Sequence, residues 1–111
     1  MKKLVARIPL AEVKEKGLVR VPYPPYDVLV TWHDDKVSAM EDSCNHSGAS
    51  LSEGWIESEC VICPVHGYAF ELATGKLLRP KGLCADQRPY ETVVENDEVV
   101  VYDAFHLTVL G

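Results

Sequence analysis

The sequence has no hydrophobic run that approaches the roughly 20 apolar residues of a membrane-spanning helix. Residues 1–9 contain two lysines but no long apolar segment, so we expect no signal peptide. Basic residues are scarce, because 11 Lys and Arg stand against 17 Asp and Glu, a net charge of −6. Since nucleic acids are bound through basic patches, this balance argues against a nucleic-acid partner. We therefore expect a cytoplasmic protein without membrane association.

Motifs of catalysis are also absent. The sequence has no glycine-rich phosphate loop and no pair of residues that suggests a nucleophile and its base. His33 and His106 lack a nearby cysteine or carboxylate pattern, so they do not suggest a mononuclear iron site, and we expect both to be structural or solvated. We expect no catalytic residues and a protein that is not itself an enzyme.

Short apolar runs separated by turn residues predict an all-β fold. The 111 residues suffice for one domain, and 7 Gly and 7 Pro interrupt the apolar segments. One short helix is expected over Leu10–Lys16, after Pro9 and before Gly17. Turns are expected at 34–35 and 96–97. Strands are expected at 3–8, 18–21, 27–32, 36–41, 55–57, 60–62, 69–71, 77–78, 90–95, 98–102 and 105–109.

Two short runs near the middle of the chain concentrate metal-binding side chains. They are Cys44-Asn45-His46 and, after 16 intervening residues, Cys63-Pro64-Val65-His66. A [2Fe–2S] cluster in which two imidazoles replace two thiolates on one iron needs this set of side chains. Zinc also accepts two cysteines and two histidines, but its usual spacing pairs cysteine with cysteine and histidine with histidine. The alternating order favours the iron–sulfur cluster over a zinc-stabilised interaction module.

The residues around these runs resemble the Rieske family over about residues 41–102. The matching segments beyond the two runs are 47–54 (SGASLSEG), 66–70 (HGYAF), 74–75 (TG) and 79–80 (RP). The resemblance implies a single Rieske domain over 1–111. Its base, a small antiparallel barrel or sandwich, would comprise 1–41 and 87–111, and an inserted cluster-binding subdomain would span about 42–86.

The resemblance also implies the ligands of one [2Fe–2S] cluster. Cys44 and Cys63 would hold the inner iron, and His46 and His66 would hold the outer iron near the surface. Pro80 matches the loop that covers the cluster in this family. Gly48 and Gly67 would let the backbone approach the cluster closely.

The sequence departs from the respiratory members of the family in two respects. Ala49 and Val65 occupy the places of two cysteines that form a disulfide between the loops there. Tyr68 and Phe70 occupy the places of a serine and a tyrosine whose hydroxyls donate to sulfur. Fewer donors leave negative charge on the cluster less stabilised, so we expect a potential near the lower end of the Rieske range, roughly −150 to +300 mV.

The remaining cysteines and the tryptophans suggest structural roles. Cys60 lies in an apolar run and is expected to be a buried strand thiol. Cys84 is expected to be an inert thiol. Disulfides in short chains need a secretory context, which we do not expect here. A bond between Cys60 and Cys84 is left open. Trp32 and Trp55 are expected in the core.

By resemblance, the protein would be a monomeric one-electron carrier. Its donor would be an NAD(P)H-dependent flavin reductase, and its acceptor the terminal component of a multicomponent oxygenase. The alternative is a Rieske-type accessory subunit of a nitrite reductase-like complex. The acidic surface suits docking onto a basic partner.

Overall fold

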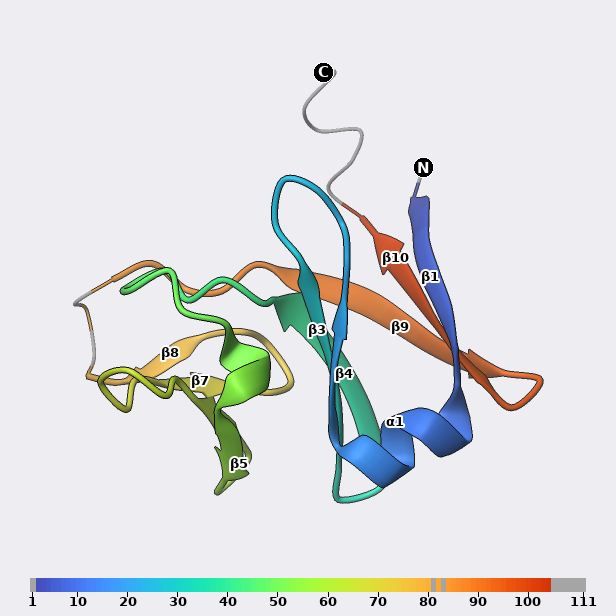
Figure 1. Cartoon of the computed structure of the whole chain (residues 1–111), viewed down its shortest axis with the longest axis horizontal. Helices are drawn as coiled ribbons and strands as arrows, with labels where there is room; N and C mark the ends of the chain where they lie inside the picture. The colour runs from blue at the N-terminus through green and yellow to red at the C-terminus, as the bar shows by residue number, and fades with distance from the viewer. Residues whose placement is uncertain (1, 81, 83, 105–111) are drawn as a thin grey trace.

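The computed structural model describes residues 2–80, 82 and 84–104 and confirms the all-β fold. Two antiparallel sheets lie side by side, with the smaller one at the left of Figure 1. The larger sheet has the order β1-β10-β9-β4-β3-β2, formed by Lys3–Pro9, Glu98–Asp103, Pro89–Glu95, Lys36–Glu41, Val28–His33 and Leu18–Val21. The smaller sheet has the order β5-β6-β7-β8, formed by Trp55–Glu57, Cys60–Ile62, Ala69–Glu71 and Leu77–Arg79.

Most expected elements agree with the structure to within one residue at each end. Helix α1 spans Leu10–Lys16, and its last turn ends at Gly17, whose φ of 74° suits glycine. A 3₁₀ helix, η1, at Leu51–Glu53 was not expected. The strand expected at 105–109 lies outside the described residues. The smaller sheet lies between β4 and β9 in the sequence, whereas the division into a base and an inserted subdomain stays a prediction.

Three hairpins turn through residue pairs with positive φ and no glycine. The pairs are Asp34-Asp35, Ser58-Glu59 and Asn96-Asp97, with φ between 49° and 67°. Two successive residues of positive φ form the type I′ turn, whose twist matches that of the flanking strands. The first and third pairs confirm the expected turns.

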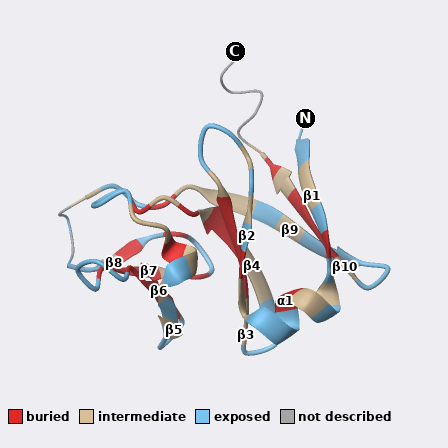
Figure 2. Ribbon diagram, viewed as in Figure 1, coloured by how far each residue is buried: buried red, intermediate tan, exposed pale blue. Residues whose placement is uncertain are grey.

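The larger sheet has its own aliphatic core. It consists mainly of β-branched residues from β3 and β10, joined by Val13 of α1, which is fully buried. In Figure 2 the buried segments, in red, run through the middle of the larger sheet, while the hairpin turns are exposed. The described residues contain no helix long and apolar enough to cross a membrane.

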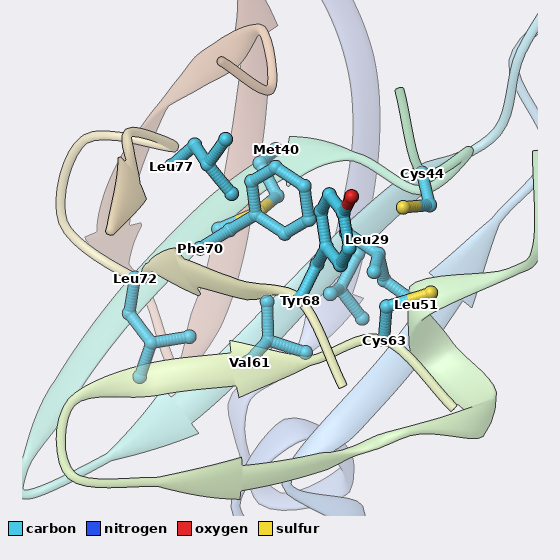
Figure 3. Packing of buried hydrophobic residues seen from close by; sticks show 10 residues of the cluster. All are labelled: Leu29, Met40, Cys44, Leu51, Val61, Cys63, Tyr68, Phe70, Leu72 and Leu77. Carbon is cyan, nitrogen blue, oxygen red and sulfur yellow. The ribbon is translucent and has the colours of Figure 1, made fainter. Parts of the chain in front are cut away.

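A second core joins the two sheets. Leu29 of β3 and Met40 of β4 pack with Val61, Phe70 and other residues of the smaller sheet, and the residues named here are fully buried. Figure 3 shows Phe70 in contact range of Met40, with Cys44 and Cys63 at one end of the same cluster. Cys44 and Cys63 therefore anchor their loops in the hydrophobic core between the sheets.

The tryptophans are not both core residues. Trp32 is partly buried against the core of the larger sheet, as expected. The prediction for Trp55 is wrong, because 48% of this residue is exposed and its Nε1 donates to Glu57 Oε2 at 3.1 Å. Trp55 lies on β5, an edge strand of the smaller sheet, where one side of the strand has no neighbour.

The shared core predicts the effect of Leu29→Ala. Removing this fully buried side chain leaves a cavity between the sheets, so the free energy of unfolding should fall by about 2–5 kcal/mol. Anaerobic denaturant unfolding followed by circular dichroism measures it. Leu4→Ala, at a position 48% exposed, is the control and should change stability by less than about 0.5 kcal/mol. Equal effects at both positions would contradict the shared core.

Candidate metal centre

The first loop is a tight hairpin that begins at Cys44. The Cys44 N–H donates to Ala49 O at 2.9 Å, and the Gly48 N–H donates to Cys44 O at 2.7 Å. Gly48 has a φ of 78°, which a residue with a side chain rarely adopts. Ser43 and Ser50 form a β-bridge that closes the loop at its base.

The second loop repeats this frame. The Cys63 N–H donates to Tyr68 O at 2.8 Å, and the Gly67 N–H donates to Cys63 O at 3.0 Å. Gly67 also has a positive φ, 72°. In both loops a glycine four residues after the cysteine closes the turn, although the histidine follows its cysteine by two residues in one loop and three in the other. Each glycine is therefore needed for its backbone conformation.

The four candidate ligands form two pairs. Cys44 and Cys63 are 2% and 0% exposed and belong to the same buried cluster. His46 and His66 lie in exposed segments, with ring centroids 5.0 Å apart. Among the described residues, no three His, Cys, Asp or Glu side chains converge on a point where one metal ion could bind. Two irons that share bridging sulfides take two protein ligands each, so the paired arrangement fits a [2Fe–2S] cluster.

The Tyr68 ring covers one of the histidines. It stacks on the His46 imidazole with centroids 3.9 Å apart and an interplanar angle of 7°. Tyr68 comes from the second loop and His46 from the first, so the stack joins the two loops. The sequence does not predict this stack, because no spacing pattern places the Tyr68 ring against a residue 22 positions earlier.

A hydroxyl donor to sulfur comes from a residue that the sequence analysis missed. Ser47 Oγ lies 3.5 Å from Cys63 Sγ and accepts the Ala49 N–H at 3.3 Å. The Ala49 N–H uses one lone pair of the Ser47 oxygen, so the hydroxyl proton is free to point at the Cys63 sulfur. Phe70 cannot donate, as expected, but the first loop supplies a donor at a different place.

The surroundings of Cys63 favour its thiolate. Burial raises the pKa of the Cys63 thiol, but hydrogen bonds from the Ser47 hydroxyl and from the backbone N–H groups of Val65 and His66 outweigh it. The pKa therefore lies below its ordinary value. Metal ligation requires the thiolate, so this environment suits a candidate ligand.

A buried carboxylate binds the residues that follow the first loop. Asp42 is 2% exposed, and its Oδ1 accepts the Ser52 N–H at 2.7 Å, while Oδ2 accepts a hydrogen bond from the Ser50 hydroxyl. Arg20 Nε lies 3.7 Å from Oδ2 and offsets the buried charge. Asp42 directly precedes the loop but gave no sequence signal, since a single Asp before a turn is common.

Cys60, Cys84 and His33 lie outside the pairs. Cys60 is a free, buried thiol on β6, as expected. Cys84 is also free and partly buried, and its thiol donates to Ala85 O at 3.4 Å. His33 Nε2 lies 3.2 Å from Glu59 Oε1, which joins the turns of the two sheets. His106 lies outside the described residues.

Comparison with known families identifies the family of the chain. The model of the Rieske [2Fe-2S] domain matches residues 4–89. This stretch is most of the chain, so the chain belongs to the Rieske [2Fe–2S] domain family, and its cofactor is one [2Fe–2S] cluster.

Particular relatives are ferredoxins of dioxygenase systems. The chain is 38% identical over 68 residues to the 3-phenylpropionate/cinnamic acid dioxygenase ferredoxin subunit of Photorhabdus laumondii. The match covers 60% of this chain and 64% of that protein, so the chain spans somewhat less than two thirds of this relative.

Solved structures share the fold. The ferredoxin of carbazole 1,9a-dioxygenase from Nocardioides aromaticivorans IC177 has a TM-score of 0.78 and 26% identity, covering 89% of this chain and 96% of its own. A ferredoxin in the complex of reduced oxygenase and oxidized ferredoxin of carbazole 1,9a-dioxygenase has a TM-score of 0.79 and 28% identity, over 88% and 91% of the chains.

The contact between Ser47 and Cys63 predicts the effect of Ser47→Ala on the reduction potential. The hydroxyl stabilises negative charge on sulfur, which increases on reduction, so its loss should lower the potential. A hydrogen bond about 1 kcal/mol stronger in the reduced state corresponds to about 40 mV for one electron. Anaerobic redox titration measures the shift. Ser38→Ala, on β4 of the larger sheet, is the control, and a Ser47→Ala potential equal to wild type would contradict this role.

Proposed function

We propose that this protein is a one-electron carrier in which Cys44, Cys63, His46 and His66 hold the [2Fe–2S] cluster. The observation that carries the proposal is the pairing of two buried thiols with two imidazoles 5.0 Å apart on an exposed edge. When bound, such a cluster accepts and releases one electron without transforming a substrate. The buried cysteines would hold the inner iron, and the histidines the outer iron.

The side chains around the pairs would then have distinct tasks. The apolar core behind Cys44 and Cys63 keeps water away from the inner side of the site. The stack of Tyr68 on His46 fixes the plane of that imidazole at the surface. His66, at the tip of the second loop, lies beside it. The exposed histidine edge is thus the shortest route for an electron to reach a partner.

The partners follow from the relatives. The matched proteins are ferredoxin subunits of dioxygenases, and one related ferredoxin is seen in a complex with its oxygenase. We propose a terminal oxygenase as acceptor, a flavin-dependent NAD(P)H reductase as donor, and a monomeric carrier in the cytoplasm. A carrier must leave each partner after every transfer, so its interface should be small, below roughly 1,200 Å² in total.

The docking face would be neutral at its centre and acidic around it. Residues 45–49 and 64–67, at the tips of the two loops, include no Asp, Glu, Lys or Arg, and Val65 is 50% exposed. Glu53, on η1, directly follows the first loop and is exposed. With a net charge of −6, the protein suits a partner with basic residues around its own redox centre.

Cluster content tests the ligand set. The wild-type protein, prepared anaerobically, should contain about two iron and two sulfide per chain and show the low average g of mixed histidine and cysteine ligation. Cys44→Ser and Cys63→Ser should lose the cluster and leave a destabilised domain, because metal binding contributes to folding. Iron analysis and electron paramagnetic resonance (EPR) of the reduced protein measure this.

Cys60→Ser is the matched control, since Cys60 is equally buried but lies on β6. It should keep the cluster. Loss of iron from Cys60→Ser together with its retention in Cys63→Ser would refute the ligand assignment, and stoichiometric zinc in the wild type would refute the function.

Ionic strength tests the docking. Stopped-flow reduction by the cognate reductase should slow as salt rises, because the screening length is only about 10 Å at 0.1 M. Glu53→Lys should reproduce this slowing at low salt. Glu15→Lys, on α1, makes the same charge change away from the cluster loops and should have little effect. Rates that are flat or rise with salt would remove the electrostatic part of the proposal. A sirohaem enzyme as the competent acceptor would favour the nitrite reductase alternative.

A further inference from the structure

A buried glutamine lies beside the first loop. Gln87 is 1% exposed and precedes β9. Its Oε1 accepts the Asn45 N–H at 2.8 Å. Its Nε2 donates to Ser43 O at 2.7 Å and to Glu41 O at 2.8 Å. The amide thus binds the backbone on both sides of Cys44.

These contacts use both hydrogens of the amide. A buried side-chain amide can donate twice and accept through its oxygen, and each group of Gln87 has a partner. An apolar side chain of similar size would leave the Asn45 N–H and two carbonyls without this partner. A Glu in its place could still accept from Asn45, but its carboxylate would face the carbonyls of Ser43 and Glu41 without donating.

The backbone of Gln87 binds the smaller sheet. Its N–H donates to Gly75 O at 2.7 Å in the turn between β7 and β8. A Cβ on Gly75, whose φ is 78°, would lie 2.3 Å from Gln87 O, so only glycine allows this approach. The neighbouring Asp86 accepts the Leu77 N–H through Oδ1 at 2.9 Å. Gln87 therefore links the first loop to the sheet that carries the second loop.

A further contact holds the same part of the loop. Asn45 Nδ2 donates to Asp86 O at 2.8 Å, so both the backbone and the side chain of Asn45 bind the segment before β9. Asn45 stands between Cys44 and His46. Its fixed backbone limits the directions in which these two side chains can point.

We propose that Gln87 is a positioning residue that sets the geometry of Cys44 and His46 toward the cluster. Its side-chain hydrogen bonds go to main-chain atoms, so it acts through the backbone of Ser43 and Asn45. This inference rests on the ligand set of the proposed function and adds a determinant outside the ligand loops.

The test compares Gln87→Leu and Gln87→Glu with the wild type in the cluster-loaded state. Two quantities are measured: the line widths of the EPR spectrum of the reduced protein and the half-life of the cluster in the presence of a chelator. Freedom of the His46 ring spreads the g values, so both variants should show broader lines. Loss of the hydrogen bonds should shorten the half-life on the order of tenfold.

Thr31→Val is the matched control. Thr31 is also 1% exposed and its hydroxyl donates to a carbonyl, that of Ser38 at 3.4 Å, but both residues belong to the larger sheet. Its line widths should equal those of the wild type. Gln87→Glu keeps the size of the side chain. If its line widths and cluster half-life equal those of the wild type, Gln87 only fills space, and the proposal is overturned. If Gln87→Leu does not fold, the comparison of Gln87→Glu with the wild type still tests the proposal.

The two proposals fail differently. A wild-type protein without a [2Fe–2S] spectrum would refute the proposed function. A wild-type protein with the cluster, and Gln87 variants with unchanged line widths and half-life, would refute the positioning role alone.

Discussion

The site depends on the packing of one sheet against the other. The two loops that carry the candidate ligands belong to different parts of the chain, and they face each other because Leu29 and Met40 of the larger sheet pack against Val61 and Phe70 of the smaller one. Removing this apolar surface from water stabilises the contact by about 25 cal/mol per Å². Both cysteine thiols lie at the edge of this core, which buries them and leaves the histidines at the surface.

Apolar packing alone does not fix the direction of the ligands, and polar contacts supply that part. Asp42 binds the residues that follow the first loop, and Gln87 binds the backbone on both sides of Cys44. Ser47 and Tyr68 each reach from one loop to a ligand on the other. Hydrogen bonds and ring stacking have directional preferences that hydrophobic contact lacks. The loops are therefore held in both distance and orientation.

Much of the fold could be predicted because its signals are local. Short apolar runs and turn pairs such as Asp34-Asp35 predicted the strands and hairpins to within a residue at most ends. The error at Trp55 arose because the sequence does not say which strand lies at the edge of a sheet. The short η1 helix was missed because three residues carry too little periodicity to be recognised.

The sequence by itself determined the family, the cofactor and the four candidate ligands, because their spacing within two short runs is specific. Only the tertiary structure decided which residues surround those ligands. Gln87 lies 42 positions from Asn45, and Ser47 lies 16 positions from Cys63, so no local pattern connects either pair. Such contacts exist only after the two sheets have packed and brought the loops together. A buried amide or a single hydroxyl gains its role from that packing, because its hydrogen-bond partners are fixed by distance in space rather than by distance along the chain.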